Sequence, residues 1–112
     1  MAPSDLELLR GTLDLLLLKT LSWGPLHGLA VVRWIEQTTH QRLQIEEGAL
    51  YPALHRMEQR GWIESEWGLS DNNRRAKYYR LTPLGRKQLR TETATWSVYS
   101  RAISKALLAE PA

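Results

Sequence analysis

Seven basic side chains gather in one short stretch of this 112-residue chain. Residues 68–90 carry Arg74, Arg75, Lys77 and four further cations against one acid, Asp71, a net charge of +6, while the whole chain carries +3. A charge run alone fits a solvated surface about as well as a binding site. Where the run coincides with a β-hairpin, as argued below, it favours contact with a polyanion.

A second group of side chains suited to nucleic-acid contact lies upstream, within residues 46–60. If that stretch is a helix, its solvent side carries Gly48, Tyr51, His55, Arg56 and Gln59. Glycine permits close backbone approach, and the polar side chains can donate to phosphates or base edges or stack on bases. A half-buried packing role for Tyr51 and plain solvent exposure for His55 are the alternatives.

The residues needed for catalysis or metal binding are missing or badly spaced. The absence of cysteine removes thiolate nucleophiles, thiolate metal sites and disulfides together. His27, His40 and His55 lack the helical spacing of a zinc site. Serine-nucleophile and glycine-rich phosphate-loop motifs are also lacking. The sequence therefore predicts no enzyme, no metal and no other cofactor.

Length and composition predict one small folded domain. A chain of 112 residues buries roughly two-thirds of its unfolded surface, so its core is thin and a dimer partner could complete it. The leucine run 15–18 is too short to span a bilayer, and Asp5 and Glu7 stand where a signal peptide has basic residues. We therefore expect a soluble, cytoplasmic protein that makes no contact with a membrane.

The first expected element is a helix over residues 5–22 with two apolar stripes. One stripe consists of Leu6, Leu9, Leu13, Leu16, Leu17 and Leu21. The other carries Leu8, Leu15 and Leu18. A helix with two apolar faces is usually buried between two bodies, and we expect the second body to be another subunit.

Two further helices should position the second group of polar residues. A Gly-Pro turn at 24–25 precedes a helix over 27–39, and a helix over 46–60 ends at Gly61. Its apolar face would be Leu50, Ala53, Leu54 and Met57. Pro52 either costs one backbone hydrogen bond or bends the first turns, and the sequence leaves this open.

Residue alternation predicts a two-stranded hairpin, which would carry the first three cations. Strands over 62–67 and 77–81 are joined by a polar loop over 68–73. Thr82-Pro83 then caps a last helix that runs to Leu108. Along that helix Leu89, Trp96 and Ile103 recur every seven residues with Tyr99 beside them, a seam typical of helix pairing.

The order helix, helix, helix, hairpin, helix is that of a winged helix-turn-helix, mainly α with a small β-hairpin. We expect residues 1–82 to form the DNA-binding domain, including the N-terminal helix, and residues 83–112 to form a C-terminal dimerisation helix. The second helix of the helix-turn-helix would enter the major groove of double-stranded DNA. The hairpin, which is the wing of this fold, would follow the DNA backbone or reach into the minor groove.

Several strings of this sequence closely resemble the PadR-type transcriptional regulators. They are L-R-G-T-L-D-L at 9–15, G-P-L-H-G at 24–28, E-G-A-L-Y-P-A-L-H-R at 47–56 and R-R-A-K-Y-Y-R-L-T at 74–82. The resemblance spans about residues 6–106. Met57, where leucine is common, and Trp62, where an aliphatic residue is frequent, depart from the pattern without touching the expected DNA contacts.

The resemblance implies a homodimeric repressor that binds palindromic operators, and for some members release by phenolic or other planar apolar compounds. Members with one short C-terminal helix dimerise through it and the first helix, which gives Leu8, Leu15 and Leu18 a partner. Two copies of Trp96 facing each other would leave an aromatic effector slot, unless Trp96 only packs the interface. The rival function is a winged-helix module that binds protein instead of DNA.

Overall fold

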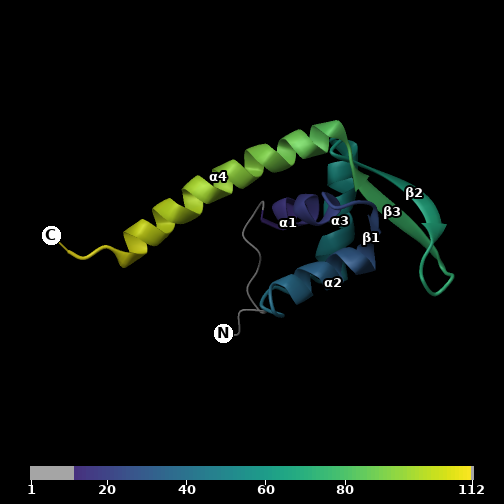
Figure 1. Cartoon of the computed structure of the whole chain (residues 1–112), viewed down its shortest axis with the longest axis horizontal. Coiled ribbons are helices and arrows are strands. Elements are labelled where there is room, and N and C mark those ends of the chain that lie inside the picture. The colour runs from purple at the N-terminus through teal and green to yellow at the C-terminus, as the bar shows by residue number, and fades with distance from the viewer. Residues whose placement is uncertain (1–11, 112) are drawn as a thin grey trace.

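The computed structural model describes residues 12–111. Its elements in chain order are α1 (Thr12–Leu21), β1 (Leu26–His27), α2 (Gly28–Thr38), α3 (Glu47–Gln59), β2 (Ile63–Leu69), β3 (Arg75–Leu81) and α4 (Pro83–Leu108). The free end of α4 and the tip of the β2–β3 hairpin lie at opposite ends of an elongated molecule of 61 × 32 × 21 Å (Figure 1). The expected start of the first helix, with Leu8, lies outside the described residues.

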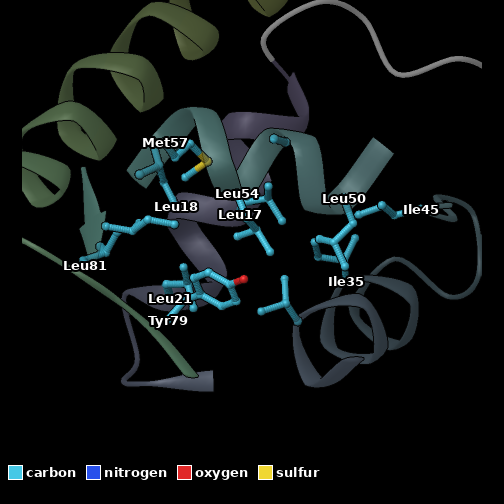
Figure 2. Packing of buried hydrophobic residues seen from close by; sticks show 13 residues of the cluster. Leu17, Leu18, Leu21, Ile35, Ile45, Leu50, Leu54, Met57, Tyr79 and Leu81 are labelled. Carbon is cyan, nitrogen blue, oxygen red and sulfur yellow. The ribbon is translucent and has the colours of Figure 1, made fainter. Parts of the chain in front are cut away.

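Helix α1 forms the centre of the hydrophobic core. It contacts α2, α3, β3 and α4. Its Leu17, Leu18 and Leu21 are almost fully buried and pack toward residues of α3 and β3 (Figure 2). The other buried apolar residues are Val31, Ile35, Ile45, Leu50, Ala53, Leu54, Met57, Ile63, Tyr79 and Leu81. The apolar face predicted for the third helix, Leu50 to Met57, is therefore confirmed.

The prediction that Leu18 contacts a second subunit is wrong. Leu18 is 0% exposed in the single chain, so it has no surface left for a partner. The reason is that Leu18 belongs to the hydrophobic core of its own chain, where it lies beside Met57 of α3 (Figure 2). Helix α4 of the same chain also contacts α1. Leu89 of α4 likewise packs in part against this core. Leu15 is half-buried and lies outside the core cluster.

The sheet has three strands, where the sequence predicted two. The order is β1-β3-β2, and β1 pairs with β3 through Leu26 opposite Tyr79 and His27 opposite Tyr78. A two-residue strand has no periodicity of its own, so it becomes visible only once β3 offers a free edge. The predicted hairpin is confirmed, with strands that extend further toward the tip than expected.

Local side-chain caps set where α2 and α4 begin. His27 Nδ1 accepts a hydrogen bond from the Ala30 amide at 3.2 Å and caps α2. Thr82 Oγ1 accepts from the Gly85 amide at 3.0 Å and donates to the Gly61 carbonyl at 2.6 Å. This second cap confirms the predicted Thr82-Pro83 helix start and also ties α4 to the beginning of the hairpin.

Helix α3 runs without interruption from Glu47 to Gln59 with Pro52 inside it. The predicted helix is therefore present despite the missing amide of Pro52. Gly61, just beyond the helix end, has φ +78°, a conformation that L side chains rarely adopt. It ends α3 and directs the chain into β2, as predicted.

Candidate nucleic-acid interface

The solvent side of α3 carries all five of the residues that the sequence placed there. Gly48, Tyr51, His55, Arg56 and Gln59 are exposed, while the opposite side of the helix is buried. A β-carbon built at Gly48 would meet nothing within 4 Å. This part of α3 therefore presents open backbone and polar side chains to whatever lies against it.

Tyr51 packs against a neighbouring helix and also remains accessible to solvent. Its side chain is 47% exposed, and its ring lies against Gly28 at the start of α2. A β-carbon at Gly28 would be 2.8 Å from the Tyr51 hydroxyl oxygen. The glycine thus makes room for the ring where α2 and α3 approach each other.

Arg56 is less free than its position on α3 implies. Its guanidinium lies 3.6 Å from the Asp14 carboxylate of α1, and Arg60 lies 4.0 Å from the same carboxylate. The Arg56 side chain is half exposed, so this ion pair is solvent-screened and weak. Arg56 can leave Asp14 for a phosphate at small cost.

The hairpin cations also differ in how free they are. Lys77 Nζ lies 3.6 Å from Glu58 of α3, and Arg80 lies 2.9 Å from Glu64 of the neighbouring strand. Arg74 and Arg75 are exposed near the tip, and the Arg75 guanidinium lies 4.5 Å from the centre of the Trp67 ring. Of the residues predicted for the wing, Arg74 and Arg75 are the ones without a carboxylate partner among the described ion pairs.

The seven cations of residues 68–90 do not form a single patch. Arg86, Lys87 and Arg90 lie on α4, not on the hairpin. The wing itself therefore carries four cations, two of which are paired with glutamates. The positive charge of residues 68–90 is thus divided between the hairpin and α4, because the chain leaves β3 and begins α4 at Thr82.

A groove of about 690 Å³ lies between α2, the start of α3 and the hairpin; we call it the α2–wing groove. Its α2 side is lined by Gly28, Leu29 and Arg33, and its α3 side by Tyr51. Its hairpin side includes Trp67, Arg74, Arg75, Lys77 and Tyr79. Arg33 and Trp67 were not assigned to a site from the sequence. The sequence signal that could have pointed to Arg33 is its spacing of four residues from Leu29, which places both on one face of the predicted helix. The structure shows that both are exposed.

Tyr79 lies at the bottom of this groove, where it joins the core. The residue is 5% exposed. Burial raises the pKa of its hydroxyl above the ordinary value of 10.0, and the nearby Glu58 and Tyr51 raise it further. The side chain is therefore neutral at physiological pH and serves packing, while the charged groups lie above it.

Residues 12–111 contain no cluster of three or more His, Asp or Glu side chains arranged to hold a metal ion. Among the helices in this range, none is both long enough and apolar enough to cross a membrane.

The architecture and the exposed helix beside a basic hairpin define a winged helix-turn-helix protein. A model of the Transcriptional regulator PadR-like family matches residues 17–91. The chain belongs to this family. Its class is thus that of transcriptional regulators and not of enzymes, as the sequence predicted.

The chain is also similar to known proteins and solved structures. A protein from Lysinibacillus sphaericus named only as uncharacterized protein X is 33% identical over 92 residues, which cover 81% of this chain and 84% of the relative. A transcriptional regulator from Clostridium thermocellum is 32% identical, with a TM-score of 0.78 over 86% of this chain and 93% of that one. A PadR family transcriptional regulator from Eggerthella lenta is 35% identical, with a TM-score of 0.76 over 90% of this chain and 86% of that one.

Proposed function

We propose that this protein is a sequence-specific, DNA-binding repressor that acts as a homodimer on a palindromic operator in the cytoplasm. Residues 1–82 would bind the DNA, and residues 83–112 would join the two subunits. The observation that carries the proposal is that Tyr51, on the exposed side of α3, lines one groove together with Arg74 and Arg75. Neither arginine has a carboxylate partner among the described ion pairs.

The contacts would divide between base reading and backbone binding. Gly48, Tyr51, His55 and Gln59 on α3 would enter the major groove, with Arg56 joining once it leaves Asp14. Arg74, Arg75 and Lys77 would contact phosphates or the adjacent minor groove. Repression would follow from occupancy of the operator, because a bound dimer denies the same DNA to other proteins.

The outer part of α4 supports dimerisation. The whole of α4 has 26 residues and spans about 39 Å, so its C-terminal end lies well away from the core (Figure 1). The large apolar side chains exposed there are Trp96, Val98, Tyr99, Ile103, Leu107 and Leu108. Exposed apolar surface of this extent marks an interaction site in a soluble protein. A second α4 would cover it and place two α3 helices about 34 Å apart, in successive major grooves.

We further propose that the dimer seam holds a site for an aromatic effector. Trp96 is 41% exposed, and its ring centre lies 6.2 Å from that of Tyr99. Two Trp96 rings across a two-fold axis could hold a planar apolar or phenolic compound and change the spacing of the α3 helices. Titration of tryptophan fluorescence with planar compounds tests this. If Trp96→Ala quenches as the parent protein does, Trp96 serves packing only.

DNA binding is tested by a gel shift against the segment upstream of the protein's own coding sequence. We expect a shifted band, and we expect Arg74→Ala with Arg75→Ala to weaken binding to every duplex. The slope of log affinity against log salt should flatten by about 0.9 for each phosphate that the variant no longer neutralises. Arg80→Ala is the matched control, because Arg80 is paired with Glu64 and does not line the groove.

The rival function, a winged-helix module that binds protein, predicts no shifted band with any duplex. An unchanged salt slope in the double variant would remove the wing from the DNA interface. The exposed cations near the hairpin tip favour DNA, since a protein-binding surface would need an apolar or acidic α3 and no basic wing.

A further inference from the structure

Arg33 is an exposed cation on the wall of the α2–wing groove that faces the wing. It lines the groove together with Leu29, one helical turn earlier on the same side of α2. Among the ion pairs within residues 12–111, none includes Arg33. An unpaired guanidinium at a groove wall offers several donors with little cost of desolvation.

The opposite wall holds a second guanidinium in a defined position. Arg75 lies over the face of Trp67, 4.5 Å from the ring centre, and both line the groove. Trp67 is 58% exposed, and it shares the groove lining with Arg75. The ring limits the conformations of Arg75 while leaving its N–H groups available.

Other polar side chains line the groove beside these cations. Tyr51 and His27 are among them. Because His27 Nδ1 accepts the Ala30 amide proton, Nε2 is the ring nitrogen that can donate a hydrogen bond. Asp71 is the only acidic side chain that lines the groove within the described residues.

We propose that the α2–wing groove holds the sugar–phosphate backbone of one DNA strand, between Arg33 on one wall and Arg75, stacked on Trp67, on the other. This rests on the proposed function and adds Arg33 as a phosphate-binding residue and Trp67 as a positioning residue. Donors on both walls, with one acid among them, match a chain of phosphates that passes through.

The first experiment measures the affinity for a short mixed-sequence duplex by fluorescence anisotropy over a range of salt concentrations. For Arg33→Ala we expect the magnitude of the log–log salt slope to fall by about 0.9 and the affinity to fall about eightfold at roughly 0.1 M salt. The loss should be the same for every duplex sequence. Arg33→Lys should keep the slope, and Arg80→Ala on the hairpin should match the parent protein.

The second experiment is a double-mutant cycle between Trp67 and Arg75. If Trp67 acts by positioning Arg75, Trp67→Ala should weaken binding in the parent and have little effect in the Arg75→Ala background. In the Arg33→Ala background it should keep its full effect, because Arg33 lies on the other wall. An equal loss in all three backgrounds would overturn the positioning role.

The outcomes separate this inference from the proposed function. If the parent protein binds the duplex with a steep salt slope and Arg33→Ala binds with that same slope, the groove assignment is wrong while DNA binding stands. If the parent protein binds no duplex, both fail. All of these side chains are exposed, and thermal unfolding monitored by circular dichroism would show that each variant keeps its fold.

Discussion

The ring of Tyr51 on α3 lies against Gly28 on α2 so closely that a β-carbon at Gly28 would be 3.0 Å from its Cε1 atom and 2.8 Å from its hydroxyl oxygen. Gly28 itself is buried, whereas Tyr51 is half exposed. The contact joins the two helices of the helix-turn-helix where both border the α2–wing groove. It therefore links the spacing of the helices to the position of one side chain proposed to touch DNA.

Gly28→Ala should separate stability from binding. The added methyl group meets the far end of an exposed side chain, so Tyr51 can rotate away and the free energy of unfolding should change by no more than about 1 kcal/mol. DNA affinity should fall, because the ring leaves its place in the groove. Urea unfolding and duplex titration measure the two effects. An affinity equal to that of the parent protein would show that the position of Tyr51 is irrelevant to DNA.

Gly48→Ala should have opposite effects on the two properties. Nothing lies within 4 Å of the new methyl group, and alanine favours a helix over glycine by about 0.5–1 kcal/mol, so the protein should become slightly more stable. DNA affinity should fall if the α3 backbone approaches the duplex at this point. Thermal unfolding and duplex titration check both halves, and a stabler variant with unchanged affinity would remove Gly48 from the interface.

Gly85→Ala should be strongly destabilising. A β-carbon there would collide with the backbone carbonyl of Trp62, and the Leu81 side chain is also within 3.2 Å. Backbone cannot move aside as a side-chain end can, so we expect a loss of about 1–3 kcal/mol in the free energy of unfolding. Arg86→Ala, at the next and exposed position, is the control and should stay within about 0.5 kcal/mol of the parent protein. Urea unfolding compares them.

Stability should decline in strongly alkaline solution because of Tyr79. Burial raises the pKa of this hydroxyl in the folded chain above its unfolded value of 10.0. As pH rises past 10.0 the unfolded chain releases its proton first, so the contribution of Tyr79 is present below pH 10 and is lost as pH passes through the folded pKa. Urea unfolding at a series of pH values should show this decline. Tyr79→Phe should decline less, and an identical slope would assign the effect to other groups.

The sequence by itself determined the helices and the hairpin, but not the two-residue strand β1. Three signals are local: the period of the apolar residues on α3, the alternation along the hairpin and the Thr82-Pro83 start of α4. Each arises from residues within a turn or two of one another. The same signals placed Gly48, Tyr51, His55 and Gln59 on the exposed side of α3. Family membership followed from the same short strings.

Only the tertiary structure decided which of these surfaces are free. Leu18 and Leu15 belong to one apolar stripe in the sequence, yet the core of the same chain buries Leu18 completely while Leu15 stays outside the core cluster. Lys77 is paired with Glu58, while Arg33 faces the wing although it lies far from Trp67 along the chain. Such relations depend on how distant segments pack, and no local pattern encodes them. The charge of each residue is thus a property of the sequence, whereas its availability to DNA is a property of the fold.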